Sequence, residues 1–325
     1  MRALPQDGAD GGKVDHGTTP IALAGLGKIA LDQHVPSLER SGAFTLAATL
    51  SLNARLADVP AFTSWDALQA EGPALAAIAL CTPPQVRMDL ARQALVAGLD
   101  VLLEKPPAAT VNEILALKAE AARRGRVLFA SWHSRFAAGV PAARAWLAGR
   151  AVRNVAVTWR EDVRQWHPGQ TWLWQPGGLG VFDPGINALS ILTEILPCPL
   201  HLTAAELEVP ENCATPIAAR LSLAGPGGLE GSADFDFRQT GPQTWSITVE
   251  TDAGHLALHE GGARLLLDEQ EQAPDPDAGS EYDALYRHFA ARLQRRQSDV
   301  DIRPLTLVAD AFLLGRQTRT DAFHD

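Results

Sequence analysis

Short apolar runs alternate with amphipathic segments along the first part of the chain, beginning at about residue 20. The apolar runs have the length of buried strands and lie at residues 21–24, 44–50, 76–80, 100–103 and 127–130. Residues 86–97 and 111–124 have a helical pattern, and the second stretch opens with Thr110 and Glu113 in capping-box spacing. Apolar strands that alternate with helices predict a parallel sheet covered on both faces.

The pattern changes after about residue 134. Segments in which apolar and polar residues alternate occupy residues 152–159, 218–223, 231–237, 245–250 and 255–259. Few helices separate them before two helical segments, 282–296 and 305–316, close the chain. Such alternation is typical of an antiparallel sheet with one face on the core. We therefore predict an α/β fold, in which a doubly wound parallel sheet precedes an α+β domain with a largely antiparallel open sheet.

Composition and charge narrow the range of partners. The chain has 325 residues, of which 46% are hydrophobic and 20% charged, as in ordinary folded proteins. A formal net charge of -10 at pH 7 disfavours nucleic acid and anionic membrane surfaces, because both would repel it. The longest apolar runs, such as residues 75–80, are far shorter than the roughly 18 residues of a membrane span.

Cysteine and tryptophan usage add two expectations. The 3 cysteines show no C-x-x-C spacing, which predicts neither a disulfide framework nor a metal site and favours a reducing, cytoplasmic location. The chain has 8 Trp but only 2 Tyr, and four of the tryptophans fall between residues 159 and 174.

The segment after the first predicted strand carries a nucleotide signature. Gly25-Leu-Gly27-Lys28-Ile29-Ala30 has the pattern G-x-G-x-x-A. Its first glycine permits a tight turn and its second lets the backbone approach a pyrophosphate. Because it opens a strand–helix–strand pattern, we predict that NAD or NADP binds to Gly25, Gly27, Lys28 and Ile29. The alternative is a glycine-rich turn without a ligand.

Further cofactor contacts are expected where the neighbouring strands end. They are Ser51, Thr82, Glu104 and Lys105. The acidic residue that usually follows the second strand and binds the ribose 2′-hydroxyl is missing, since Ser51-Leu52-Asn53 stands there. No carboxylate would repel a 2′-phosphate at this place, so NAD and NADP both stay open.

The domain boundaries follow from these patterns. Residues 1–19 are polar, lack the apolar core of a signal peptide and are expected to form a disordered leader. Residues 20–134 are predicted to form a dinucleotide-binding Rossmann domain, and residues 135–325 a substrate-binding and oligomerisation α+β domain.

Two segments carry residues suited to proton transfer. Lys105 lies in Glu104-Lys105-Pro106-Pro107, at the sheet edge where doubly wound folds bind ligands, although it could also be a surface lysine in a turn. Asp183 and Asn187 are four residues apart and would share one face of a helix. Asp183 followed by Pro184 is equally the pattern of a simple helix N-cap, so capping and catalysis both stay open.

Taken in order, the Gly25 loop, the Glu104-Lys105-Pro106 turn and a G-G-x-G-x-x-D-x-G-x-N segment at 177–187 resemble one family. It is the sugar-oxidoreductase family of glucose-fructose oxidoreductase and inositol dehydrogenase. More narrowly, the chain resembles bacterial L-arabinose and D-galactose 1-dehydrogenases. The stretches that carry this narrower resemblance are residues 103–107, 131–135, 159–170, 177–191 and 298–305.

The resemblance implies an NAD(P)-dependent enzyme, without a metal, that oxidises the C1 hydroxyl of L-arabinose and/or D-galactose to the aldonolactone. It implies catalytic roles for Lys105, Asp183 and Asn187. The positions that would bind the sugar are Lys105, His133, Glu161, Trp166, His167, Asp183, Asn187 and Trp245. The family also makes a homodimer plausible. The tryptophan excess would then suit a sugar, which offers apolar C–H faces and hydroxyl edges.

Two positions depart from the patterns that the resemblance provides. Asn187 stands where the wider family has the histidine of D-x-G-x-H. An amide does not accept a proton at neutral pH, so the base is expected to be Asp183 or Lys105. Leu52 stands where the arabinose enzymes have an arginine that can pair with a 2′-phosphate, which weakens the preference for NADP.

Other interpretations stay open. The chain could act on another sugar or an inositol, or be a non-enzymatic, dinucleotide-binding regulator of a sugar pathway. Without the resemblance, His133 and His167 are more typical of packed or exposed histidines than of ligands. Arg87 is expected to extend along the surface at a helix start. Trp65 and Trp146 are expected in ordinary packing.

Overall fold

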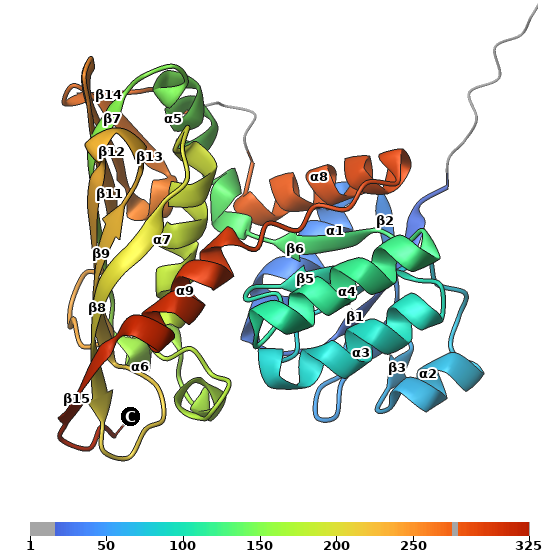
Figure 1. The fold of residues 1–325 in the computed structure, drawn as a ribbon. Helices are drawn as coiled ribbons and strands as arrows, with labels where there is room; N and C mark the ends of the chain where they lie inside the picture. Colours follow the sequence, from blue (N-terminus) through green and yellow to red (C-terminus); the bar gives the residue numbers. More distant parts are fainter. Residues whose placement is uncertain (1–16, 275–278, 325) are drawn as a thin grey trace, which may run out of the picture.

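The first half of the chain forms a parallel sheet of six strands in the order β3-β2-β1-β4-β5-β6, on the right in Figure 1. The computed structural model describes residues 17–274 and 279–324. The strands are β1 (Thr19–Ala24), β2 (Phe44–Leu50), β3 (Ala61–Phe62), β4 (Ala77–Leu80), β5 (Asp100–Glu104) and β6 (Leu128–Ser131). Five of them match the predicted strands to within two residues, because each contains a short apolar run that is largely buried. The sixth, β3, has only two residues and was not predicted.

Helices connect these strands. They are η1 (Ala30–His34), α1 (Val35–Ser41), α2 (Trp65–Glu71), α3 (Pro84–Val96), α4 (Val111–Arg124) and η2 (His133–Phe136). The predicted capping box is present, since the Thr110 side chain accepts from the Glu113 backbone N–H and the Glu113 side chain accepts from that of Thr110. Helices α3 and α4 cover one face of the sheet, where they pack on Ile78, Leu80 and Leu103.

The second sheet has nine strands in the order β14-β13-β12-β11-β7-β10-β9-β8-β15 and stands edge-on at the left of Figure 1. Its strands are β7 (Val152–Arg160), β8 (His201–Pro210), β9 (Ala218–Ala224), β10 (Glu230–Asp236), β11 (Thr244–Thr251), β12 (Gly254–His259), β13 (Arg264–Leu267), β14 (Gln270–Glu271) and β15 (Arg316–Thr320). Only β7–β10 and β8–β15 pair in parallel. The predicted α/β fold with a largely antiparallel second sheet is therefore confirmed.

The remaining helices belong mostly to this second sheet. They are α5 (Val140–Leu147), α6 (Val163–Trp166), η3 (Thr171–Trp174), α7 (Phe182–Ile195), η4 (Pro226–Gly228), η5 (Glu260–Gly262), α8 (Glu281–Arg295) and α9 (Arg303–Leu314). Helices α5, α7 and α9 cover the face of the sheet that is turned toward the first sheet (Figure 1). Helix α7 is almost entirely buried, which places its first turn deep between the two sheets.

Helix α8 lies elsewhere than predicted. It was expected to close the second domain, but it packs beside α1 on the first sheet (Figure 1). Its Leu285, Tyr286 and Phe289 are fully buried against β1, β4 and β5. The amphipathic pattern identified a buried face without identifying its partner. The boundary at residue 134 stays a prediction, but 135–325 does not pack as one unit on the second sheet.

A segment after α8 ties the two sheets together. Asp299 pairs with β6 in parallel, donating from its N–H to the Leu128 carbonyl and accepting from the Ala130 N–H at 3.0 and 2.9 Å. Two residues later, the Asp301 carboxylate accepts from Arg135 at 2.6 Å. Arg135 also donates to the Ser190 carbonyl of α7 at 3.0 Å. These bonds hold α7 against the end of the first sheet.

The predicted leader and the question of a membrane span can both be compared with the structure. The predicted leader lies outside the described residues except for its last three, and of these Thr19 already begins β1. Within residues 17–274 and 279–324, we find no helix that combines the length and the apolar character needed to cross a membrane.

Candidate active site

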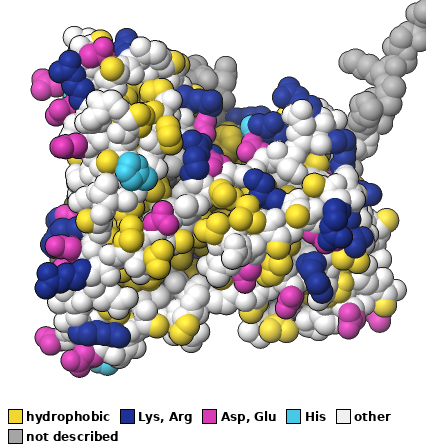
Figure 2. Space-filling model, in the orientation of Figure 1, with side chains coloured by type: hydrophobic (Ala, Val, Ile, Leu, Met, Phe, Trp, Pro, Cys, Tyr) yellow, Lys and Arg dark blue, Asp and Glu magenta, His cyan; other side chains and the backbone are white. Residues whose placement is uncertain are grey.

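A cavity of about 1060 Å³ lies between the carboxyl edge of the first sheet and the helix-covered face of the second. Hydrophobic side chains gather along the depression where the two halves meet (Figure 2). All the predicted site residues line this one cavity: Gly25, Gly27, Lys28, Ile29, Ser51, Thr82, Glu104, Lys105, His133, Glu161, Trp166, His167, Asp183, Asn187 and Trp245. They come from both sheets, so the fold brings together segments far apart in sequence. Their individual roles stay predictions.

The glycine-rich loop has the shape that a dinucleotide needs. Gly25 has φ +86°, and a Cβ there would lie 2.7 Å from the Thr82 nitrogen, so no other residue fits without a shift of the backbone. A Cβ on Gly27 would meet nothing within 4 Å, which leaves its backbone open to a ligand. The buried hydroxyl of Thr82 has no hydrogen-bond partner among the described residues. The loop therefore fits a pyrophosphate and offers it a donor.

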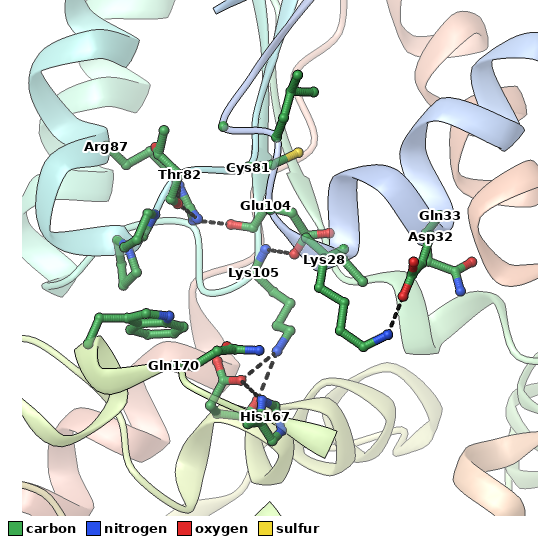
Figure 3. A pocket seen from close by; sticks show the side chains of 18 of the residues that line it. Lys28, Asp32, Gln33, Cys81, Thr82, Arg87, Glu104, Lys105, His167 and Gln170 are labelled. Atoms are coloured by element: carbon green, nitrogen blue, oxygen red, sulfur yellow. Dashed lines mark hydrogen bonds and ion pairs between the residues drawn. The ribbon is translucent and has the colours of Figure 1, made fainter. Parts of the chain in front are cut away.

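The cavity extends along the loop that follows β2. Ser51, Leu52 and Asn53 line it there, with Trp65 of α2 nearby. Leu52 is 78% exposed and offers neither a carboxylate nor a cation to a bound ribose. Trp65 is only partly engaged in packing, so the expectation of ordinary packing missed its place at the cavity wall. Lys28, at the cavity edge, pairs with Asp32 one turn further along (Figure 3).

Lys105 and Asp183 form the central ion pair of the cavity. The Lys105 Nζ lies 3.1 Å from Asp183 Oδ2 and 3.2 Å from the Asp183 carbonyl (Figure 3). Their side chains are only 12% and 4% exposed, so Lys105 is not a surface lysine. The N-cap of α7 is Val181, and Asp183 lies inside the first turn with its carboxylate on Lys105. The capping interpretation of Asp183 is therefore wrong, because α7 begins two residues earlier than an N-cap at Asp183 requires.

Asn187 stands one turn further along α7 and also lines the cavity. The spacing of four residues puts it on the same side of the helix as Asp183, as predicted. Its backbone carbonyl accepts from the Ser190 hydroxyl at 2.7 Å.

Glu161 holds two other predicted residues in place. It follows β7, is 2% exposed, and its two oxygens accept from different partners. Trp245 donates from Nε1 to Glu161 Oε2 at 2.8 Å, and the His167 Nε2 lies 3.0 Å from Oε1. Glu161 is thus not a solvated carboxylate, and protein partners already engage both of its oxygens.

The tryptophans divide between the cavity and the core. Trp245 packs between Trp159 and Trp166, with ring centroids 5.8 and 5.0 Å apart, and all three line the cavity. Trp172 also lines it, whereas Trp174 packs on Phe237 and Phe323. Sequence reasoning assigned no role to Trp159 or Trp172. The clustering of tryptophans between residues 159 and 174 was the signal that could have found both.

A buried polar cluster supports the turn that carries Lys105. Glu104 accepts from the Tyr282 hydroxyl at 2.6 Å and from His34, and its other oxygen accepts from the Lys105 backbone N–H. Burial alone would raise the pKa of Glu104, but the hydrogen bond from His34 and the charges of His34, His133 and Lys105 outweigh it and lower the pKa to about 2. Glu104 was predicted to bind cofactor, yet these protein donors already engage its carboxylate.

His34 and Tyr282 complete this cluster. Burial lowers the pKa of His34, but neighbouring Cys81, Tyr286 and Glu104 outweigh burial and raise it well above its ordinary value. Burial next to Glu104 raises the pKa of Tyr282. His133 stacks on Tyr282 with ring centroids 5.1 Å apart and lies 2.6 Å from Glu281. Because Tyr282 and Glu281 begin α8, this helix supports the cavity wall.

Arg87 occupies an unexpected position. It is 2% exposed and donates to the carbonyls of Thr82, Glu104 and Pro106. Burial lowers its pKa to about 10. The expectation of a surface arginine is therefore wrong, because three carbonyls at the ends of β4 and β5 need donors that the sheet does not provide. Arg87 fixes the turns that carry Thr82 and Lys105.

Comparison with known proteins relates this geometry to one family. Residues 20–131 match the model of an oxidoreductase family with an NAD-binding Rossmann fold, GFO_IDH_MocA. A galactose 1-dehydrogenase of Pseudomonas fluorescens is 46% identical over 306 residues, covering 94% of this chain and 98% of that protein.

Solved structures agree with this. The crystal structure of a D-galactose 1-dehydrogenase from Rhizobium etli is similar with a TM-score of 0.89 and 49% identity, covering 95% of this chain and 98% of the other. A 3-ketoreductase of Actinomadura kijaniata, solved with NADP and TDP-benzene, has a TM-score of 0.78 at 17% identity, covering 93% and 99%. At that identity the likeness concerns the fold alone.

Proposed function

This chain belongs to the GFO_IDH_MocA oxidoreductase family, and from that premise we propose that it is an NAD(P)-dependent aldose 1-dehydrogenase acting on D-galactose and L-arabinose. The observation that carries the proposal is the buried Lys105–Asp183 pair, in one cavity with the Gly25 loop. The galactose 1-dehydrogenases at 46% and 49% identity support the choice of sugar. The product would be the aldonolactone.

Lys105 and Asp183 would handle the proton of the reaction. A bound nicotinamide supplies the hydride acceptor. Asp183 would accept the proton of the anomeric hydroxyl, while the Lys105 ammonium, 3.1 Å from that carboxylate, donates to the same hydroxyl oxygen and orients it. Asn187 would offer its amide to a neighbouring hydroxyl, since it cannot itself accept a proton at neutral pH.

The aromatic wall would select the sugar by shape. L-arabinopyranose is D-galactopyranose without the exocyclic CH2OH, and the two share their ring configuration from C1 to C4. Trp166 and Trp245 offer apolar faces to the C–H side of such a ring. A missing hydroxymethyl group changes binding by roughly 1–3 kcal/mol, so both sugars should react. Glucose is inverted at C4 and would leave a buried polar group unpaired.

We further propose that the enzyme accepts both NAD and NADP. Ser51 and Leu52 present neither a carboxylate that repels a 2′-phosphate nor a cation that pairs with it. The difference between the two cofactors in kcat/KM should therefore stay within about tenfold, the equivalent of roughly 1.4 kcal/mol.

An initial-rate screen of aldoses against NAD and NADP, followed by the absorbance of the reduced nicotinamide, tests these proposals. We expect D-galactose and L-arabinose to be the best substrates and D-glucose to react at least tenfold less efficiently. Equal activity on glucose and galactose would contradict the sugar pocket. Activity on an inositol alone would identify the other dehydrogenase that the sequence leaves open.

A further inference from the structure

An imidazole lies beside Asp183, although position 187 carries an amide. His167 directly follows α6, where its backbone N–H donates to the Val163 carbonyl at 2.8 Å. Its Nδ1 lies 3.7 Å from Asp183 Oδ2, and that nitrogen is buried without a hydrogen-bond partner among the described residues. Figure 3 shows His167 next to the ammonium end of Lys105. His167, the residue that follows α6, thus supplies the titratable ring that α7 lacks.

Glu161 determines which nitrogen of this ring carries the hydrogen. One Glu161 oxygen accepts from Trp245, and the other lies 3.0 Å from the His167 Nε2. A carboxylate only accepts, so the hydrogen of a neutral His167 is on Nε2 and its lone pair is on Nδ1. That lone pair faces Asp183.

The cluster around His167 holds one ammonium and two carboxylates. Lys105 carries one positive charge, while the carboxylates of Asp183 and Glu161 carry two negative charges around a neutral His167. One negative charge is therefore unbalanced in a buried place, since both carboxylates are no more than 4% exposed. A proton on His167 removes the imbalance and gives each carboxylate a cation, Lys105 at 3.1 Å and His167 at 3.0 Å.

We propose that His167 accepts the proton that Asp183 takes from the sugar, and that Glu161 is a positioning residue that keeps His167 in the tautomer able to accept it. This rests on the proposed function. The sugar O–H bond breaks and its proton passes through Asp183 Oδ2 to His167 Nδ1. The C1–H electron pair leaves with the hydride to NAD(P)+, and a C1=O bond forms. Asp183 becomes a carboxylate again, and the aldose has lost two electrons.

Every group that faces His167 fits this role. Glu161 faces Nε2 from the end of β7, and Asp183, paired with Lys105, faces Nδ1 from α7. The Phe237 ring, whose centroid is 5.4 Å from that of the imidazole, covers it from the position just after β10. Among the residues with described contacts, no cation touches the ring.

The tautomer can be measured without any activity. In protein labelled with 15N-histidine, the His167 ring, assigned with His167→Asn, should show the Nε2–H tautomer in the neutral form. In Glu161→Gln, the amide oxygen can keep the hydrogen bond from Trp245, and the amide NH2 group then faces the His167 Nε2. Because that group donates, Nε2 must accept, and the ring should shift to the Nδ1–H tautomer. A neutral wild-type His167 in the Nδ1–H form would overturn the proposal.

Kinetics tests the transfer itself. His167→Asn keeps a polar group near the Nδ1 position but cannot hold a proton, so kcat should fall about 10- to 100-fold with KM changed only a few-fold. Glu161→Gln should lower kcat to a similar extent. Added imidazole should raise the kcat of His167→Ala. The exposed His201 provides the control, since His201→Asn should leave both constants unchanged.

The outcomes separate this proposal from the proposed function. If wild-type protein oxidises no aldose, the proposed function fails, while the NMR result still decides whether Glu161 sets the tautomer. If His167→Asn raises KM and leaves kcat unchanged, His167 only binds the sugar and the proton transfer is refuted. A loss of kcat in His167→Ala without rescue by imidazole would also refute it.

Discussion

At the scale of single residues, the site depends on side chains whose partners are fixed by burial. Asp183 touches Lys105 and faces His167, and each of these three side chains comes from a different element. A carboxylate 4% exposed and paired with an ammonium has little freedom to rotate away. Its position relative to a bound hydroxyl is therefore preorganised, which is the condition for efficient general-base catalysis.

Asp183→Asn should lower kcat with saturating D-galactose by about 10²- to 10⁴-fold, because the amide keeps the shape but accepts no proton. Steady-state rates with NAD would measure this. The exposed Asp66 of α2 offers a matched control, and Asp66→Asn should leave kcat unchanged. An Asp183→Asn enzyme within a few-fold of wild type would show that another group is the base.

We expect cofactor preference to respond to the side chain at position 52, which lines the cavity beside the loop after β2. Leu52→Arg would place a guanidinium at the cavity edge, where Leu52 is 78% exposed, and let it pair with a 2′-phosphate. We expect kcat/KM for NADP to rise about 10-fold and that for NAD to stay within a few-fold. Leu313→Arg adds the same charge at an 81% exposed position of α9 and should change neither value. An equal gain for NAD would exclude recognition of the phosphate.

At the scale of elements, α8 shows how a helix distant in sequence supports the site. It packs on the first sheet through Leu285, Tyr286 and Phe289. Its first turn delivers the Tyr282 hydroxyl to Glu104, whose other oxygen accepts from the Lys105 backbone. The position of Lys105 therefore depends on a helix that begins more than 170 residues later, since the Tyr282–Glu104 hydrogen bond spans 178 residues of sequence.

Tyr282→Phe should destabilise the protein by about 1.5–3 kcal/mol, because it removes a hydrogen bond to a buried carboxylate. Tyr286→Phe removes a hydroxyl from the same helix whose one hydrogen bond within the described residues is to His34, at 2.7 Å, and it should cost less, about 1 kcal/mol. Urea unfolding of the two variants would compare them. A larger loss in Tyr286→Phe would mean that Glu104 does not hold α8 in place.

At the scale of the whole molecule, several carboxylates link stability to acid pH. Burial opposes ionisation of Asp301 and Asp283. Hydrogen bonds outweigh burial, from arginines at Asp301 and from an arginine and serines at Asp283, and they lower each pKa to about 2. The pKa of Glu104 is lowered to the same value. They join separate parts of the chain: Asp301 bonds to Arg135, and Asp283 of α8 bonds to Arg40 of α1. Protonation would thus loosen contacts that hold the two sheets and α8 together.

The free energy of unfolding should therefore fall as the pH is lowered from about 4.5 toward 2. A carboxylate whose pKa is lower in the folded than in the unfolded protein stabilises the folded state at pH values above its unfolded-state pKa. This contribution is lost as the pH falls through the folded-state pKa. Urea midpoints at pH 7, 4 and 3 would measure this, and Asp301→Asn should flatten the slope. A urea midpoint that does not change at acid pH would contradict this linkage between the carboxylates and stability.

His34 has the opposite effect on the pH dependence of stability. Its pKa is raised in the folded state, so it stabilises the fold below pH about 6.5, and this contribution is lost as the pH rises through the folded-state pKa.

The local elements and the family follow from short stretches of the chain. Apolar runs of strand length, the capping box at Thr110 and the Gly25 loop depend on neighbours within a few residues, so their periodicity and spacing predict them. The motifs around Lys105 and residues 177–187 are also local, and the family they suggested is confirmed by comparison.

Which of those residues meet depends on how the whole chain folds. The partners of Asp183, the burial of Arg87 and the docking of α8 on the first sheet are contacts between distant segments. An amphipathic or polar pattern records that a side chain is buried or bonded, but not by what, because many packings satisfy the same pattern. The imidazole beside Asp183 is the clearest case, since position 187 alone indicated an absent histidine and the fold supplied one from position 167.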